Sequence, residues 1–137
     1  MHITLESDYA VRIVSCLTTA NKRLDAKTIA ERTCVTLRFA LKILRKLVAG
    51  GIVKSYKGTQ GGYELAKPAG DISLRDVIET VEGKYYISRC LHDDYSCTRG
   101  MDGVCCYQKV FKEISEEVRD RLAQYNFETL TEKDSKK

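Results

Sequence analysis

The chain has 137 residues, of which 43% are hydrophobic and 31% charged, and its formal net charge is +4. This length and composition suit one soluble globular domain, or one domain with an appended helix. The sequence contains no stretch approaching the roughly 18 consecutive apolar residues of a membrane span, and its first residues lack a secretory signal pattern. We therefore expect a protein of the reducing cytoplasm, without a membrane partner, in which lasting disulfides are uncommon.

Positive charge is concentrated in the first half of the chain. Residues 1–67 hold twelve Lys and Arg against five Asp and Glu, whereas residues 68–137 hold eleven against fourteen. Seven basic residues lie between positions 32 and 57, and no acid follows them until Glu64. A one-sign field on half of a small domain favours a polyanionic partner, most simply duplex DNA, although a solvated basic face would give the same count.

The first half of the chain predicts three helices. Apolar residues at helical spacing predict the first from Leu5 to Leu17. Asp25 is a suitable N-cap for a short helix over residues 26–32, and Thr36 for a third helix over residues 37–48. The glycines of "AGG" end this third helix, because glycine readily adopts the left-handed conformation.

A hairpin and two further helices follow. The runs "IVKSY" and "YELA", joined by "KGTQGG", predict a β-hairpin with a flexible tip. "ISLRDVIETVEG" predicts a helix capped by Ser73 and ended by Gly83. From Tyr107 to Tyr125 apolar residues recur three or four apart, which predicts a long amphipathic helix. The expected segments are therefore a domain over 1–83, a cysteine loop over 84–106, a long helix over 107–126 and a flexible tail over 127–137.

Three helices and a hairpin outline a winged helix-turn-helix, so the expected fold is mainly α with a small β-hairpin. The third helix would enter the major groove and the hairpin, or wing, would touch the DNA backbone. Lys42 and Arg45 are candidate DNA contacts because they are cations on this helix, and Lys57, Gly58 and Gly61 because they form the wing tip. The long C-terminal helix suits pairing of two copies on a palindromic operator with half-sites about 34 Å apart, although it could simply pack on its own domain.

The order of these motifs resembles the Rrf-type winged-helix regulators, the family of IscR, NsrR, RirA and CymR. The likeness runs from residue 1 to about 125 through "ITLESDYAVRI", "IAERTCVTLRFALKILRKLVAGGIVKS", "KGTQGGYELAKPAGDISLRDVIETVEG" and the spaced cysteines. It implies a DNA-binding transcriptional repressor rather than an enzyme, with Thr36, Arg38 and Lys57 in contact with DNA. Where IscR-like members read bases with a glutamate, this chain has Leu41, so its target sequence need not be theirs.

Four of the six cysteines lie in "SRCLHDDYSCTRGMDGVCC", at positions 90, 97, 105 and 106. Thiolates suit an iron–sulfur cluster or zinc, but the close cysteine pairs of structural zinc sites are absent from the sequence. Unliganded thiols and a metal-free thiol switch are open alternatives. Cys16 and Cys34 lie within predicted helices and are expected to be small buried hydrophobes.

The family resemblance assigns roles to the clustered cysteines. Cluster-binding members carry three cysteines in this loop, which implies Cys90, Cys97 and Cys105 as ligands, with Cys106 in reserve. IscR-like members take a histidine three residues after the last cysteine, where this chain has Gln108. NsrR-like members use an N-terminal aspartate of the partner subunit. Asp8 matches that position, although it could equally be an ordinary first-turn acid, and His92 is the reserve ligand. This set favours a 4Fe–4S over a 2Fe–2S cluster.

We therefore expect a homodimeric repressor whose DNA affinity is controlled by a cluster that senses nitric oxide, oxygen or redox state, or iron–sulfur status. The alternative is a metal-free thiol-switch or ligand-responsive regulator of the same family. An electron carrier or an adaptor with a structural metal is less favoured, because neither requires a basic helix and wing. The sequence also contains no cofactor fingerprint or catalytic triad.

Overall fold

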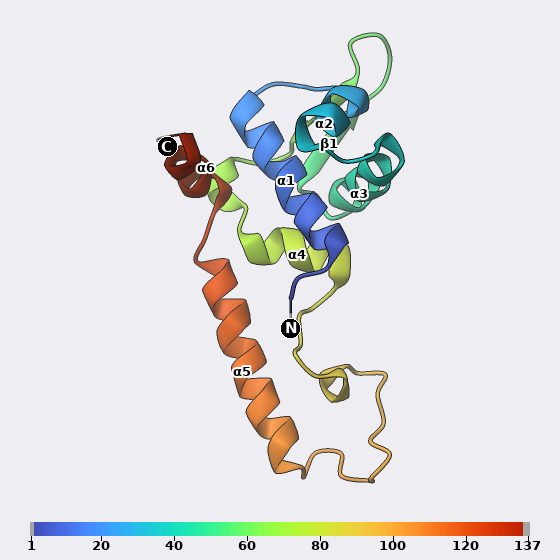
Figure 1. The fold of residues 1–137 in the computed structure, drawn as a ribbon, viewed down its shortest axis with the longest axis vertical. Helices are drawn as coiled ribbons and strands as arrows, with labels where there is room; N and C mark the ends of the chain where they lie inside the picture. The colour runs from blue at the N-terminus through green and yellow to red at the C-terminus, as the bar shows by residue number, and fades with distance from the viewer. Residues whose placement is uncertain (1, 136–137) are drawn as a thin grey trace.

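The computed structural model describes residues 2–135 and confirms the mainly helical fold with one hairpin. A compact body carries a long helix and a loop that extend away from it (Figure 1). No helix in the described part of the chain is long and apolar enough to cross a membrane. In chain order the elements are α1 (Leu5–Ala20), α2 (Ala26–Thr33), α3 (Leu37–Ala49), β1 (Val53–Tyr56), β2 (Gly62–Leu65), the 3₁₀-helix η1 (Ala69–Asp71), α4 (Leu74–Glu82), the 3₁₀-helix η2 (Arg89–Leu91), α5 (Cys106–Ala123) and α6 (Phe127–Ser135).

The predicted helix starts are confirmed by their capping hydrogen bonds. Asp25 and Thr36 each accept the backbone N–H three residues on, at 2.7 and 3.2 Å, and so open α2 and α3. Ser73 accepts the N–H of Asp76 at 3.1 Å, and the Asp76 carboxylate accepts the N–H of Ser73 at 2.9 Å, which is a complete capping box. The local sequence therefore sets the residue at which α3 begins. The position of α3 in turn decides what its basic residues can contact.

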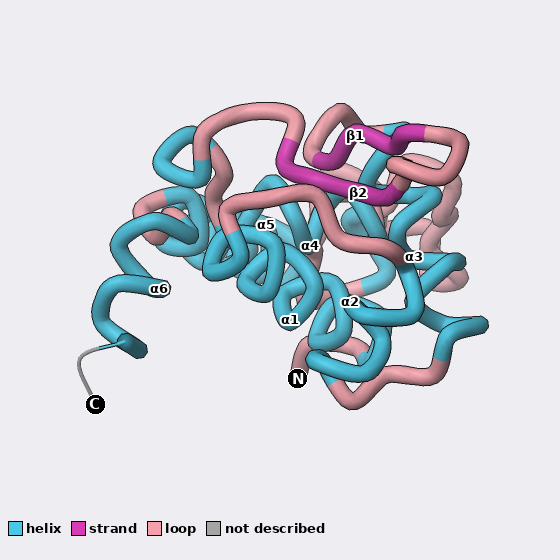
Figure 2. The backbone as a smooth tube through the Cα atoms, turned by 90° about the horizontal axis from the view of Figure 1, so that it is seen from above, coloured by secondary structure: helices cyan, strands magenta, loops and turns pink. Residues whose placement is uncertain are grey.

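Helix α1 lies at the centre of the hydrophobic core. Its residues Ile13, Val14 and Leu17 are at most 2% exposed, and α1 packs against α2, α3, α4 and α6. Seen from above, these helices gather on one side of the hairpin (Figure 2). This packing fixes the orientation of α3 and of the hairpin relative to each other.

A short third stretch of backbone, between α1 and α2, pairs with the hairpin. Strands β1 and β2 pair antiparallel, with Val53 opposite Leu65. Leu24, between α1 and α2, donates its N–H to the Tyr63 carbonyl at 2.9 Å and accepts the N–H of Tyr63 at 2.7 Å. A Cβ at Gly62 would lie 2.6 Å from the Leu24 carbonyl oxygen, so only glycine allows this close approach.

The C-terminal segment corrects the predicted flexible tail. Residues 127–135 form α6, which packs against α1 and η1, and Phe127 is 2% exposed within the core. The Phe127 N–H donates to the Ile72 carbonyl at 3.1 Å, and the Leu74 N–H donates to the Tyr125 carbonyl at 2.9 Å. The polar composition of this segment predicted a flexible tail, although Phe127 within it packs into the core. Residues 136–137 of the predicted tail lie outside the described residues.

The two cysteines outside the loop differ in their exposure to solvent. Cys16 is partly buried against the core, and this burial raises the pKa of its thiol. Cys34 is exposed, so the expectation of a buried residue was wrong there. It forms the C-cap of α2 with φ of 56°, in the left-handed region, where the chain leaves the helix at the surface.

Candidate DNA interface and cysteine loop

The predicted basic residues share one exposed face of α3. Arg38, Lys42 and Arg45 are all exposed and lie four and then three residues apart, which places them on one side of a helix. The opposite side is fully buried and consists of Ala40, Ile43, Leu44 and Leu47. Thr36 precedes this face as the N-cap, and its side chain is engaged by the Phe39 N–H. The core therefore turns the cations of α3 outward.

The four cations of α3 differ in their partners. Glu6 of α1 pairs with Lys42 at 2.6 Å and with Lys46 at 2.8 Å, and these hydrogen bonds lower the pKa of Glu6. Arg38 and Arg45 make no ion pair with any residue that the structure describes. The charge of Lys42 is thus partly compensated, whereas those of the two arginines are available to an external anion.

A half-exposed apolar strip borders this basic face. Leu37, in the first turn of α3, is 46% exposed, and Leu41, one turn later, is half-buried. The two residues are four apart and therefore lie on the same side of the helix. Neither leucine is among the DNA contacts predicted from the sequence.

The wing tip extends from the hairpin and presents Lys57. The loop between β1 and β2 projects from the body in Figure 1, and Lys57 is exposed at its start and forms no ion pair within residues 2–135. Gly58 has φ of +92°, a conformation that suits glycine. A Cβ at Gly61 would lie 2.6 Å from the Tyr56 carbonyl oxygen. The two candidate glycines are therefore required by the shape of the tip itself.

The four clustered cysteines lie between η2 and the start of α5. Cys90 is in η2, Cys97 directly precedes a turn, Cys105 is the N-cap of α5 and Cys106 is its first helical residue. All are free thiols; the first three are partly buried and Cys106 is exposed. Within residues 2–135 no three His, Cys, Asp or Glu side chains are gathered closely enough to hold a metal ion. One chain therefore does not assemble the predicted ligand set.

The two proposed non-cysteine ligands have other partners. Asp8 lies in the first turn of α1 and pairs with Arg12 at 2.8 Å. His92 is exposed and stacks edge-to-face on Tyr86, with ring centroids 5.2 Å apart. Free, partly buried thiols in one loop are nevertheless the donors that an iron–sulfur cluster uses, and a surface carboxylate is open to a second chain. These side chains are therefore of the chemical types that can bind such a cluster.

Gln108, considered in the sequence only as a poor metal ligand, fastens the cysteine loop to α5. Its Nε2 donates to the Cys90 carbonyl at 3.0 Å, and its Oε1 accepts the Gly103 N–H at 3.1 Å. One side chain therefore holds two parts of the loop that are thirteen positions apart. These parts border a hollow of about 650 Å³ that is also lined by His92 and Lys112.

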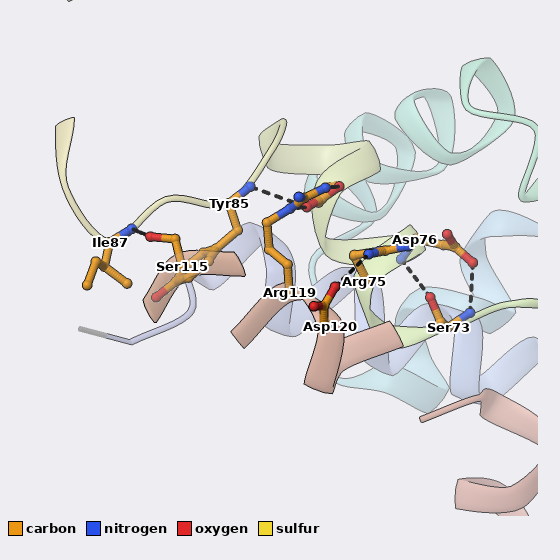
Figure 3. Close-up of polar contacts among 9 residues, drawn as sticks. Ser73, Arg75, Asp76, Tyr85, Ile87, Ser115, Arg119 and Asp120 are labelled. Carbon is orange, nitrogen blue, oxygen red and sulfur yellow. Dashed lines mark hydrogen bonds and ion pairs between the residues drawn. The ribbon is translucent and has the colours of Figure 1, made fainter. Parts of the chain in front are cut away.

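The start of the loop is hydrogen-bonded to both α4 and α5 (Figure 3). Glu79 of α4 accepts from Arg119 of α5 at 3.2 Å and from the Tyr85 N–H at 3.4 Å. Burial alone would raise the pKa of Glu79, but these donors and the positive charge of Arg119 outweigh it, so the pKa lies below its usual range. Ser115, fully buried on α5, accepts the Ile87 N–H at 3.0 Å. The sequence carries no local signal for the contacts of Arg119 and Ser115, because their partners lie 40 and 28 positions away.

Comparison with known proteins supports this architecture. The Rrf2 family model, described as "Iron-dependent Transcriptional regulator", matches residues 3–133. A Mycobacterium tuberculosis protein, provisionally named an HTH-type transcriptional regulator, is 35% identical over 85 residues, which is 61% of this chain and 53% of that protein. The chain spans 39–59% of the length of the first four curated relatives.

Solved structures share the fold over nearly the whole chain. The structure named T. potens IscR superposes with a TM-score of 0.75 at 23% identity, covering 98% of this chain and 88% of that one. CymR, named as the global cysteine regulator of B. subtilis, superposes with a TM-score of 0.74 at 21% identity, covering 96% and 97%. At such low identity these likenesses concern the fold alone. With the family model matching almost every residue, the chain belongs to the Rrf2 family of transcriptional regulators.

Proposed function

We propose that this chain is a homodimeric transcriptional repressor that binds a palindromic operator through α3 and the wing. The observation that carries the proposal is the exposed basic face of α3, with Arg38 and Arg45 unpaired among the described residues, next to a projecting wing tip that presents Lys57. Phosphate contacts of this kind supply most of the affinity of a DNA-binding domain. The family membership supports the same function.

Each residue has a distinct part in the proposed complex. Thr36 and Arg38, at the start of α3, reach base edges, as N-terminal residues of recognition helices do. Lys42 and Arg45 approach phosphates from the same face, and Lys57, Gly58 and Gly61 bring the wing backbone close to the adjacent groove. Leu37 and Leu41 border that face and offer apolar contact to thymine methyl groups, the apolar feature of the major groove.

Substitution of Lys57 and of Arg38 is expected to give different results. Lys57→Ala should weaken binding to all duplexes and lower the slope of log affinity against log salt by about 0.9, because one phosphate contact is lost. Arg38→Ala should instead reduce discrimination between the preferred duplex and single-base variants by about tenfold or more. Fluorescence anisotropy with labelled duplexes at several salt concentrations measures both effects.

The matched control is Lys133→Ala, which removes an exposed cation from α6, far along the chain from the wing. It should leave both the affinity and the salt slope unchanged. A wild-type protein that binds no duplex, or binds every duplex equally, would contradict the proposed function.

We further propose that Cys90, Cys97 and Cys105 hold a 4Fe–4S cluster together with Asp8 of the partner subunit. Cys106 and His92 are the reserve ligands. When bound, such a cluster supplies a centre that reacts with nitric oxide or oxygen or responds to iron–sulfur status. Gln108 and Ser115 keep the loop attached to α5, whatever the thiols bind.

A hydrogen bond connects the end of α4, where the cysteine loop begins, to α3, so a change in the loop can affect the proposed DNA-binding helix. The loop begins at the end of α4, where the Val81 carbonyl accepts a hydrogen bond from Lys46 of α3 at 3.3 Å. Lys46 also pairs with Glu6, two residues before Asp8. A movement of the loop or of the Asp8 region would therefore reach α3 through Lys46.

A metal-free thiol switch is the second candidate. It is supported by the free thiols of the loop, by the lack of a gathered metal-binding group among residues 2–135 and by the shared fold with CymR. The iron and sulfide content of the protein separates the two candidates.

The proposed dimer contact is an exposed apolar stripe on α5. Tyr107, Val110, Phe111 and Ile114 are 64%, 50%, 38% and 38% exposed, and their spacing places them on one side of the helix. Ser115 and Arg119 contact the loop and α4 instead. The structure thus leaves an apolar face of a long helix free for a second copy, as a two-fold dimer requires.

Val110→Asp is expected to shift the protein from dimer to monomer at micromolar concentration, because it places a charge in the apolar contact. Sedimentation velocity measures the change. Lys112→Asp introduces the same side chain on the opposite side of α5 and should leave the dimer intact. A wild-type protein that sediments as a monomer would refute this role of the stripe.

A further inference from the structure

We infer that Arg23 is a positioning residue that holds the wing tip in the conformation that presents Lys57. Arg23 lies in the segment "NKRLD" between α1 and α2, outside both proposed DNA-contacting elements. The inference rests on the DNA-binding function proposed above and assigns it a residue that neither the resemblance nor the charge pattern indicated.

One guanidinium group contacts both sides of the wing tip. The Arg23 Cζ lies 3.4 Å from the centroid of the Tyr56 ring, immediately before the tip, and its Nη1 donates to the Gln60 carbonyl at 2.9 Å, near the end of the tip. A planar guanidinium can stack flat on an aromatic ring and donate a hydrogen bond in its own plane at the same time, whereas a lysine ammonium is a point charge without a planar stacking face. Arg23 thereby fixes the separation between the two ends of the tip.

The surroundings of Arg23 make this contact rigid. The next residue, Leu24, is joined to Tyr63 of β2 by two backbone hydrogen bonds, so the backbone at Arg23 is fixed to the hairpin. The Tyr56 hydroxyl donates to the Glu64 carboxylate at 2.6 Å, which holds the ring on which Arg23 stacks. Arg23, Tyr56 and Glu64 therefore form a brace between the α1–α2 segment and both strands.

The tip has few other restraints among the described residues. Residues 57–60 are exposed, and the backbone hydrogen bond that closes the tip is that from Gly61 N–H to the Gly58 carbonyl, at 3.0 Å. A hollow of about 560 Å³, lined by Asp25, Thr28 and Gln60, separates the tip from the start of α2. A glycine-rich tip without the brace would have to be ordered on binding, at a cost in affinity.

Arg23 is itself an exposed cation, so a positioning role has to be separated from a direct contact between Arg23 and phosphate. If Arg23 acts by placing Lys57, its removal should have little effect once Lys57 is absent. If Arg23 binds phosphate independently, the two effects should add, and a lysine should largely replace it.

The test is a double-mutant cycle on the full chain with a duplex that the wild-type protein selects from a random-sequence library. Arg23→Ala is expected to weaken binding about tenfold, as ordering of a flexible segment costs. Arg23→Lys should weaken it similarly although it keeps the charge, and Arg23→Ala should add less than about twofold to the effect of Lys57→Ala. Lys22→Ala, the neighbouring exposed lysine, is the matched control and should have no such coupling.

A second measurement needs no DNA. Backbone ¹⁵N relaxation of the free protein should show greater nanosecond motion at residues 57–61 in Arg23→Ala than in the wild type. Additive effects in the cycle, rescue by Arg23→Lys, or an equally ordered tip in Arg23→Ala would each overturn the inference. A wild-type protein that selects no duplex would instead overturn the proposed function, so the two failures are distinct.

Discussion

Phe127→Ala is expected to lower the free energy of unfolding by about 3–5 kcal/mol, the usual cost of removing a buried phenylalanine from a core. Phe127 is 2% exposed and is part of the same buried cluster as Ile13 and Val77. The variant keeps the backbone hydrogen bond to Ile72 but loses this packing, so it should loosen the attachment of α6 to the body. Chemical denaturation followed by circular dichroism measures the change in stability.

The control for this variant is Glu132→Ala, an exposed position on the same helix. Its effect should stay within about 0.5 kcal/mol, as for most surface substitutions. If Phe127→Ala cost less than about 1 kcal/mol, the burial of Phe127 against the core would be contradicted.

The second large effect concerns the cysteine loop. Cys97→Ser is expected to abolish the iron and acid-labile sulfide of anaerobically purified protein, because a serine oxygen is a poor ligand for the soft cluster iron. Cys34→Ser, an exposed thiol at the end of α2, should retain the full content. Iron and sulfide assays, together with the absorption spectrum, measure both variants.

A wild-type protein that contains stoichiometric zinc, or no metal, would exclude the cluster. In the metal-free case the thiol switch would remain, and mass spectrometry of the oxidised protein should then find a disulfide among Cys90, Cys97, Cys105 and Cys106. Loss of that disulfide in Cys97→Ser, with altered DNA affinity, would support the second candidate.

The fold could be predicted from the sequence because its main signals are local. Asp25, Thr36 and Ser73 each cap a helix by accepting a backbone N–H three residues further on. The glycines at 58, 61 and 62 lie where a positive φ or a close backbone contact favours glycine. The outward direction of the α3 cations followed from helical spacing alone. Helix α6 could not be predicted in the same way, because its composition is polar and the burial of Phe127 is recognised only when the rest of the core is present.

The candidate sites were predictable only as lists of residues. The sequence indicated which cations lie on α3 but not that Glu6, thirty-six positions earlier, pairs with Lys42. It indicated the thiols but not the role of Gln108, whose partner Cys90 lies eighteen positions away. Such contacts depend on tertiary packing, and neither charge nor periodicity encodes them. The grouping of the cysteines with Asp8 stays a prediction.

The position of Phe127 also has a consequence for biosynthesis. A chain is synthesised from its N-terminus onward, so α1 is made before α6, and α6 carries the residue that completes the packing around α1. The winged domain therefore leaves the ribosome with part of its core open, and that apolar surface is covered only once α5 has been synthesised and α6 returns to α1. Chaperones that bind exposed apolar segments would meet the chain in this interval, and a ribosome stalled within α5 would hold it there.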